Sequence, residues 1–324
     1  MSKPKVYIGQ KIPIEIETYI AQYCDYEMWQ DSGKVPESVL YEKVQDVDGL
    51  LLSGIQINEA LLNHAPKLKA VSNISVGYSN YDIMAMKKHS IIGTHTPGSL
   101  DDTVADLIFA LILSSARRIT EMDRYMRAGL WQAEDEKILL GKDVHHCTIG
   151  IIGMGRIGEL VAKRAKLGFE MNVLYHNRNR KPKVEKNLGA IYTTMPELLQ
   201  QSDFVVLMAP LTEETYHMID HKAFEMMKND AFFINASRGH LVNEADLIIA
   251  LKTHMISGAG LDVYECEPIE EDNPLLSLSN VVAVPHIGSA TEKTRYKMVM
   301  QAAENLVAAM MGNTPKDIVP ELRN

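Results

Sequence analysis

A glycine-rich turn near the middle of the chain constrains the fold more than any other feature. Gly153, Gly155 and Gly158 have the spacing Gly-x-Gly-x-x-Gly, directly after the apolar residues 148–152 and at the start of an amphipathic stretch, residues 156–167. A lone motif of this kind is weak, but a strand before it and a helix after it are the context that a dinucleotide-binding turn requires. Gly153 would permit the tight turn, Gly155 the approach of a pyrophosphate, and Gly158 close packing of the helix on the strand.

The start of the predicted helix supplies the remaining phosphate contacts. Backbone N–H groups around Arg156 and Ile157 would hold the phosphates with help from the helix dipole. Met154 lies inside the same turn and is the third non-glycine residue that we expect to contact the cofactor.

The next apolar run, residues 172–175, ends in a loop that indicates which dinucleotide binds. An NAD site usually carries an acidic residue about 20 positions after the turn, whereas residues 174–181 contain no acid and the first is Glu185. Arg178 could bind a ribose 2′-phosphate through two parallel hydrogen bonds. We therefore expect a preference for NADP(H), read by Asn177 and Arg178 with Arg180 as a third candidate. The alternative is a solvated basic loop and an NAD(H) site.

Short apolar runs alternate with longer amphipathic ones along the whole chain, which is typical of parallel sheets with helices on their faces. The sequence predicts two α/β units that divide near residue 100, the second one larger. Strands are expected at residues 6–8, 49–52, 68–73, 91–92, 148–152, 172–175, 204–207, 231–234, 257–261 and 281–284. Helices are expected at residues 14–23, 58–64, 82–89, 103–129 as one long helix, 156–167, 221–228, 243–252 and 292–311.

Composition excludes several classes of protein. The chain has 324 residues, and its 33 basic and 42 acidic residues give a net charge of −9, which argues against nucleic acid or an anionic membrane surface as the main partner. The longest charge-free run, residues 273–291, contains two prolines and cannot be a membrane-spanning helix. The first residues lack the long apolar region of a signal peptide, so we expect a cytoplasmic protein.

No metal site or disulfide framework is expected from the sequence. Cys24, Cys147 and Cys266 are odd in number and widely spaced, and they form no Cys-x-x-Cys pair. His145 and His146 are adjacent, but no further ligand lies near them in the sequence.

Three further segments place charged side chains at the ends of predicted strands. Residues 235–239 end one strand with Arg238, residues 260–268 end another with acids that include Glu267, and residues 284–291 follow a third with His286. In an open α/β sheet ligands bind outside the carboxyl ends of the strands, so all three can converge on one crevice. An imidazole is suited to proton transfer near neutral pH, and an arginine to gripping a carboxylate.

With these segments the chain resembles the D-isomer-specific 2-hydroxyacid dehydrogenases over essentially its whole length. The resemblance is carried by residues 74–78, 95–97, 153–158, 235–239, 260–268 and 285–291. Residues 143–146 and 288–291 look most like the NADPH-linked glyoxylate/hydroxypyruvate reductase and 2-ketogluconate reductase branch. The resemblance implies hydride transfer from NADPH to the carbonyl of a small 2-keto acid, which gives the D-2-hydroxy acid.

The resemblance also implies roles for individual residues. Arg238, Glu267 and His286 match the catalytic residues of the family: the arginine binds substrate and polarises the carbonyl, the histidine donates the proton, and the glutamate favours imidazolium and orients its ring. Substrate contacts are implied for Arg238 and His286, for the backbone N–H groups of Val76 and Gly77, and for Ser289. Further cofactor contacts are implied for Thr103, Pro210, Thr215, Ala236 and Asp262.

The family's architecture implies two doubly wound parallel-sheet domains, of Rossmann and flavodoxin-like type, with a cleft between them. Residues 1–100 with 289–324 would form a discontinuous substrate-binding domain, and residues 101–288 the dinucleotide-binding domain. The resemblance also implies a homodimer through an arm at residues 103–144 and the cofactor domain.

Other functions remain open at this point. An NAD-linked relative such as phosphoglycerate dehydrogenase usually carries additional C-terminal sequence, whereas only 38 residues follow His286 here (324 − 286). Formate dehydrogenases pair the histidine with glutamine rather than with an acid such as Glu267. A redox-sensing corepressor on the same scaffold is the non-catalytic alternative, because fold does not fix function.

Overall fold

The computed structural model describes residues 2–33 and 35–323. The chain divides into two compact units, residues 1–100 with 290–324 (unit 1) and residues 101–289 (unit 2). Among the helices of the described residues, none has the length and apolar character needed to cross a bilayer. Each unit is a parallel sheet with helices on both faces, so the predicted α/β class is confirmed.

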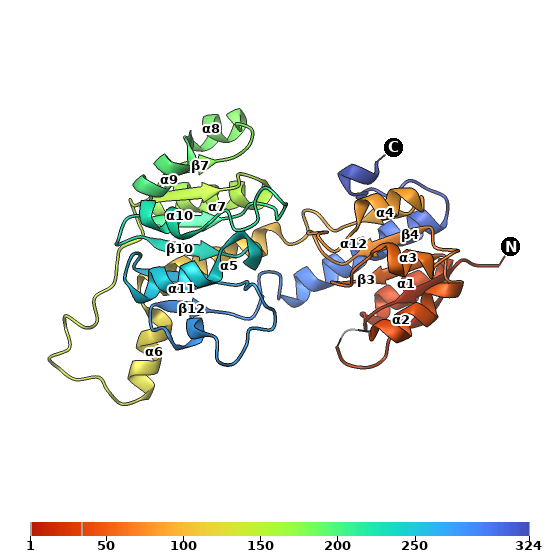
Figure 1. Ribbon diagram of the computed structural model, residues 1–324, viewed down its shortest axis with the longest axis horizontal. Helices are drawn as coiled ribbons and strands as arrows, with labels where there is room; N and C mark the ends of the chain where they lie inside the picture. Colours follow the sequence, from red (N-terminus) through yellow and green to blue (C-terminus); the bar gives the residue numbers. More distant parts are fainter. Residues whose placement is uncertain (1, 34, 324) are drawn as a thin grey trace. The chain divides into compact units, whose positions relative to one another are not determined.

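Unit 1 contains a five-stranded parallel sheet in the order β2-β1-β3-β4-β5, the flavodoxin-like order 2-1-3-4-5. α1 and the C-terminal α12 pack on one face of this sheet, and the core on the other face includes residues of α2, α3 and α4 (Figure 1). Its elements are β1 (Lys5–Ile8), α1 (Ile14–Tyr23), β2 (Asp25–Met28), α2 (Glu37–Lys43), η1 (Val44–Asp46), β3 (Gly49–Leu52), α3 (Glu59–Asn63), β4 (Ala70–Asn73), α4 (Ile83–Lys88), β5 (Ile92–Thr94), α12 (Glu292–Met310) and η4 (Pro320–Leu322).

Unit 2 contains a seven-stranded parallel sheet in the order β12-β11-β10-β9-β6-β7-β8. α5 and α7 pack together on one face, and α9, α10 and α11 follow one another on the other. Its elements are α5 (Asp101–Ala116), α6 (Ile119–Arg127), β6 (Thr148–Ile152), α7 (Arg156–Phe169), β7 (Asn172–His176), α8 (Pro182–Leu188), β8 (Ile191–Tyr192), α9 (Met195–Gln201), β9 (Phe204–Leu207), α10 (His221–Met226), β10 (Phe232–Asn235), η2 (Gly239–Leu241), α11 (Glu244–Lys252), β11 (Gly258–Leu261), η3 (Pro274–Ser277) and β12 (Val281–Ala283).

The strand order of unit 2 fixes where a ligand can bind. From β6 the chain runs outward to β7 and β8, then returns to place β9 on the other side of β6. The order reverses between β6 and β9, and the crevice outside the carboxyl ends of strands at such a switch point is where open α/β sheets bind ligands. The strands β9 and β10 are buried at every position, which is typical of central parallel strands covered on both faces. The sheet thus presents the turn after β6 and the loops after β9, β10 and β11 along one edge.

The prediction of one long helix at residues 103–129 is wrong, because α5 ends at Ala116 and α6 begins at Ile119. Between them Arg118 adopts a left-handed backbone conformation with φ 54°. Its guanidinium bonds to the carboxylate of Glu121 and to the carbonyl groups of Ile138 and Leu140. The helix break therefore starts an arm, residues 118–141, that leaves the end of α5 and returns to it (Figure 1), where the N–H of Lys142 donates to the Ala116 carbonyl.

Several other boundaries differ from the sequence-based prediction. The helix expected to end before Gly168 continues to Phe169 and ends where Glu170 adopts φ 53°. The strands β2 and β8 and the helices α2, α8 and α9 were not predicted. Each has seven residues or fewer, and β2 alternates exposed and half-buried positions. Elements this short carry too little apolar periodicity to be recognised.

Candidate active site

The glycine turn has the geometry expected of a phosphate-binding turn. Gly153 has φ 105°, and a Cβ there would lie 2.6 Å from the carbonyl carbon of Met208, so no other residue fits. A Cβ at Gly158 would lie 2.4 Å from the Gly153 carbonyl oxygen, which explains the close contact between α7 and the turn. A Cβ at Gly155, in contrast, would meet nothing within 4 Å. The open space at Gly155, beside the first N–H groups of α7, fits a pyrophosphate.

The remaining residues of the turn contribute backbone rather than side chains to this space. Met154 is buried, with 1% of its surface exposed, so its side chain packs into the core. The Arg156 guanidinium pairs with Asp101, at 2.9 Å from Nε to Oδ2. Ile157 and Gly158 follow in the first turn of α7. The N–H groups at the start of α7 are therefore what this segment offers to a phosphate.

The loop after β7 contains two arginines in different circumstances. Arg180 forms two hydrogen bonds with Glu185, of 3.1 and 2.6 Å, and lies over the ring of Tyr192. Arg178 is exposed and makes no hydrogen bond or ion pair within the described part of the chain. Asn177 is half-buried, and its amide donates to the Asn179 carbonyl at 2.9 Å. Arg178 is thus the arginine of this loop that is available to a ligand.

His286 and Glu267 form the best-defined polar pair of the site. Nδ1 of His286 lies 2.7 Å from Oε2 of Glu267, and the other carboxylate oxygen accepts the N–H of Tyr264 at 3.1 Å. Burial alone would raise the pKa of the Glu267 carboxyl, but the hydrogen bond and charge of His286 and the Tyr264 N–H outweigh it, so this pKa lies below its usual range. An ionised carboxylate only accepts hydrogen bonds, so Nδ1 carries a proton and Nε2 is the nitrogen that exchanges one.

Asp262, at the end of β11, holds the loop that carries His286. Its two carboxylate oxygens accept the N–H groups of Ile287 at 2.6 Å and of Gly288 at 2.9 Å. Burial raises the pKa of the Asp262 carboxyl, and these two hydrogen bonds oppose the rise only in part. His286 itself has φ 50°, in the left-handed region that non-glycine residues rarely adopt. The carboxylate therefore stabilises a loop conformation that is uncommon by itself and that sets the direction of the imidazole.

Arg238 follows β10, in the loop next to the one that carries Glu267. Its Nη1 donates to the Ser237 carbonyl at 2.6 Å, and the Asn235 amide donates to the Arg238 carbonyl at 3.1 Å. Burial lowers the pKa of the Arg238 guanidinium and the charge of Glu267 raises it, so the two groups interact electrostatically. An arginine stays protonated at neutral pH. Arg238, Glu267 and His286 lie in the loops that follow β10, β11 and β12, and these three strands are neighbours in the sheet.

The structure also positions the other predicted contacts of unit 2. Pro210 and Thr215 share the loop after β9, where Oγ1 of Thr215 donates to the Pro210 carbonyl at 2.7 Å. Ala236 is half-buried directly after β10, and Thr103 lies in the first turn of α5. Ser289 is half-buried at the end of unit 2.

Val76 and Gly77 belong to unit 1, in the loop after β4. The Val76 carbonyl forms a hydrogen bond with Nδ1 of His95 at 2.8 Å, and the Gly77 carbonyl accepts a hydrogen bond from the side-chain amide of Asn73 at 3.0 Å. Among the described residues, no backbone group accepts the N–H of Val76 or of Gly77. The loop therefore has both of these carbonyl groups engaged and both N–H groups available for an anion.

Two residues that shape the site had no predicted role. Asn235 accepts the Ser237 N–H and donates to the Arg238 carbonyl, so it fixes the loop after β10. The Tyr264 hydroxyl donates to the carbonyl groups of Leu261 and Val284 and so ties the loop after β11 to the end of β12. Their signal in the sequence is an asparagine or tyrosine at a strand end, which is too common to be informative alone.

The fold and the site together define a class of protein. A Rossmann sheet with a glycine turn at its switch point, and with an Arg–Glu–His group on adjacent strand ends, is typical of oxidoreductases that use a nicotinamide dinucleotide. Residues 109–288 match the D-isomer-specific 2-hydroxyacid dehydrogenase, NAD-binding domain. The chain belongs to this family and is an NAD(P)-dependent oxidoreductase.

Relatives of known description agree with this assignment. The chain is 44% identical over 319 residues to a glyoxylate/hydroxypyruvate reductase B of Escherichia fergusonii, which covers 98% of each chain. It is 45% identical over 322 residues to a glyoxylate reductase of Thermococcus litoralis, covering 98% of this chain and 97% of the relative. An NADPH-dependent glyoxylate/hydroxypyruvate reductase of Sinorhizobium meliloti, solved with NADP and malonate, superposes with a TM-score of 0.86 at 29% identity, covering 99% of this chain and 98% of the other.

Proposed function

We propose that the protein reduces small 2-keto acids to D-2-hydroxy acids with NADPH, with glyoxylate and hydroxypyruvate as the main substrates and 2-ketogluconate as a further candidate. The observation that carries the proposal is the 2.7 Å pair of Glu267 and His286 on the same strand edge as Arg238 and the glycine turn. The names of the relatives support the substrate class. NADPH, when bound, supplies the hydride that goes to the carbonyl carbon.

The proton for the carbonyl oxygen comes from His286. As an imidazolium it donates from Nε2 while Nδ1 stays hydrogen-bonded to Glu267. The keto acid thus gains a hydride and a proton, and His286 recovers its proton from solvent. Glu267 keeps the ring oriented throughout the cycle.

The substrate carboxylate needs cationic and N–H partners. The planar guanidinium of Arg238 grips a carboxylate and polarises the adjacent carbonyl, stabilising the charge that develops on its oxygen. We assign the free N–H groups of Val76 and Gly77 to the carboxylate as well, and Ser289 to the substrate side chain. The roles of Thr103, Pro210, Thr215 and Ala236 in binding the cofactor, and of Asp262 in holding its nicotinamide amide, are part of the same proposal.

A spectrophotometric assay tests the reaction. NADPH absorbance is expected to fall when glyoxylate, hydroxypyruvate or 2-ketogluconate is added, and the three values of kcat/KM rank the substrates. Absence of turnover with all three would favour a non-catalytic module that binds a dinucleotide.

We expect replacement of Arg178 with alanine to reduce the preference for NADPH over NADH. The exposed guanidinium makes no ion pair with any of the described residues and would bind the 2′-phosphate, and a hydrogen bond to a charged group contributes about 1.5–3 kcal/mol. The value of kcat/KM for NADPH should therefore fall roughly 10- to 100-fold, with a much smaller change for NADH. Steady-state kinetics with both cofactors measures the ratio.

Arg180 supplies a matched control in the same loop. Because Glu185 already engages its guanidinium, the Arg180→Ala variant should retain most of the NADPH preference. A clear preference of the wild-type protein for NADH would contradict the NADP(H) proposal, and so would equal losses with both cofactors in Arg178→Ala.

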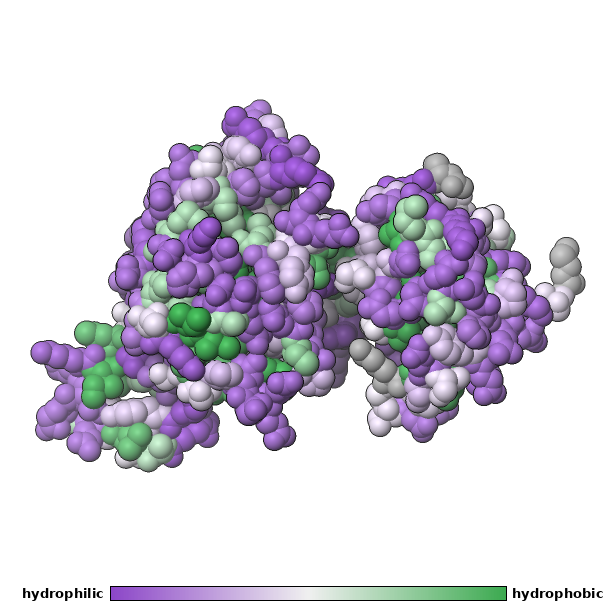
Figure 2. All heavy atoms as spheres, in the orientation of Figure 1, coloured by the Kyte–Doolittle hydropathy of each residue, from purple (hydrophilic) through white to green (hydrophobic). Residues whose placement is uncertain are grey.

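We also propose that the arm pairs two copies of the chain. Apolar surface is exposed on the arm (Figure 2), and contiguous exposed apolar surface is typical of sites where proteins associate. The large apolar side chains exposed there are Ile119, Met126, Leu130, Trp131, Ile138, Leu139 and Leu140. Sedimentation should give twice the mass of one chain, and Leu140→Asp should shift the population toward monomer. A wild-type protein that sediments as a monomer at micromolar concentration would contradict this.

A further inference from the structure

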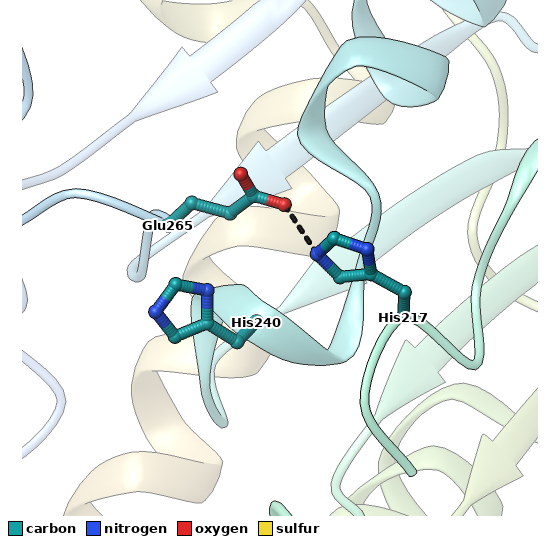
Figure 3. A group of neighbouring side chains, drawn as sticks. All are labelled: His217, His240 and Glu265. Carbon is teal, nitrogen blue, oxygen red and sulfur yellow. Dashed lines mark ion pairs between the residues drawn. The ribbon is translucent and has the colours of Figure 1, made fainter.

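Three side chains of types that bind metals meet in unit 2 outside the Arg–Glu–His group. His217 lies in the loop after β9, His240 in η2 after β10, and Glu265 in the loop after β11 (Figure 3). One ligand atom from each residue lies within 4.8 Å of the other two. They come together because β9, β10 and β11 are adjacent and parallel, so the loops at their carboxyl ends are neighbours.

Two of these side chains are already held in position. Nε2 of His217 lies 2.7 Å from Oε1 of Glu265, and the ring of Tyr216 stacks on that of His217 with centroids 4.0 Å apart. The Glu265 carboxylate also accepts the N–H of Glu244 at 3.2 Å, while the Glu244 carboxylate accepts the N–H of Glu265 at 3.1 Å. This reciprocal pair orients Glu265 toward the histidine without any ion.

The third side chain, His240, is exposed and can adjust its ring. Within the described residues its imidazole makes no hydrogen bond or ion pair, and its nearest ring partner is Tyr216 at 5.8 Å between centroids. The backbone below it is fixed, because its carbonyl accepts the His217 N–H at 2.9 Å. Zinc holds nitrogen and oxygen ligands at about 2.0–2.2 Å, so the donor atoms of a bound ion lie roughly 3–3.5 Å apart. The 2.7 Å between the donor atoms of His217 and Glu265 is slightly below that range, and the exposed His240 side chain is free of packing that would prevent it from turning toward them.

We propose that His217, His240 and Glu265 bind a divalent transition-metal ion of the zinc class. Two imidazoles and one carboxylate suit such an ion better than Mg²⁺ or Ca²⁺, which prefer oxygen ligands alone. Three protein ligands leave a further coordination position for water. The inference does not depend on the reaction proposed above, since none of the three residues takes part in it.

A bound ion would join the loops that carry two of the proposed catalytic residues. His240 is two residues after Arg238, and Glu265 is two residues before Glu267. The two backbones already touch between these positions, because a Cβ on Gly239 would lie 1.9 Å from the Tyr264 carbonyl oxygen. Coordination would therefore cross-link the carboxyl ends of β9, β10 and β11 and stabilise unit 2.

Titration of metal-free, tag-free protein with Zn²⁺ by calorimetry tests the site. The wild-type chain is expected to bind one equivalent, to retain zinc after dialysis, and to melt at a higher temperature with zinc than without it. His240→Ala removes an exposed ligand and should weaken binding at least about tenfold and reduce the rise in melting temperature. Glu265→Gln keeps an acceptor for the Glu244 N–H but loses the charge, and should also weaken binding.

Two control variants distinguish this site from other zinc-binding groups on the surface. The adjacent histidines are removed together in His145→Ala/His146→Ala, and the exposed thiol beside Glu265 in Cys266→Ser. Both variants should bind zinc as the wild type does. The proposal is overturned if the wild type shows no saturable binding, if His240→Ala binds with unchanged affinity, or if a control variant abolishes binding. In the first case the His217–Glu265 contact is an ion pair that fixes the loop and nothing more.

Discussion

Replacing His286 with alanine should reduce kcat for 2-keto acid reduction by about 10²–10⁴-fold, the usual contribution of a general acid. The expected loss follows from the 2.7 Å contact between Nδ1 and Glu267, which leaves Nε2 as the only ring nitrogen able to deliver a proton. NADPH consumption with saturating hydroxypyruvate measures it.

The backbone at His286 requires a specific control, because its φ of 50° is unfavourable for alanine. His286→Asn tolerates the left-handed conformation but has no acid to offer, so it should be as inactive as the alanine variant. His254 is also exposed with φ 54°, and His254→Ala should retain full activity. Turnover of His286→Asn near the wild-type rate would rule out His286 as the proton donor.

Arg238→Ala should lower kcat/KM for the keto acid by about 10²–10³-fold, which is typical for loss of one charged group that stabilises a developing oxyanion. Arg238→Lys keeps the charge but not the planar fork and should recover only part of the activity. The kinetic constants of both variants with glyoxylate and NADPH give the comparison.

The Arg238 guanidinium also donates a hydrogen bond to the Ser237 carbonyl, and Arg238→Ala removes this bond. The experiment therefore needs evidence that the loop after β10 keeps its structure in the variant. Asn235 fixes this loop through its own amide, so the melting temperature and the affinity for NADPH should change little in Arg238→Ala. A variant that keeps its kcat/KM within threefold of the wild type would contradict the proposed role.

The parts of the fold that sequence reasoning located best are those with dense local signals. The strands at residues 148–152 and 204–207 and the helix Ile14–Tyr23 have the predicted bounds. Asn58, Asp82 and Asn243 cap α3, α4 and α11 with their side chains. The helix break at Arg118 was missed because the contacts that stabilise it come from residues about 20 positions away, such as Ile138 and Leu140. Periodicity within one window carries no information about such contacts.

In the candidate site, too, sequence reasoning located the features with local signals and missed those that depend on contacts between distant residues. The glycine turn could be placed from its flanking strand and helix, and the pairing of Glu267 with His286 was expected from the resemblance. The role of Asp262 in holding the N–H groups of Ile287 and Gly288 could not be read from the sequence. The cluster of His217, His240 and Glu265 spans three loops. The two histidines are 23 positions apart in the sequence (240 − 217), and His240 and Glu265 are 25 positions apart (265 − 240). No spacing rule identifies ligands that only the strand order brings together.

Isotope labelling is the direct test of hydride transfer to a 2-keto acid with formation of the D-isomer. Hydroxypyruvate would be incubated with the protein and with NADPH that carries deuterium at the C4 position from which the hydride is transferred. The glycerate would then be separated on a chiral column and analysed by mass spectrometry. The expected product is D-glycerate with one deuterium at C2. Formation of L-glycerate, of unlabelled glycerate, or of no glycerate would contradict it.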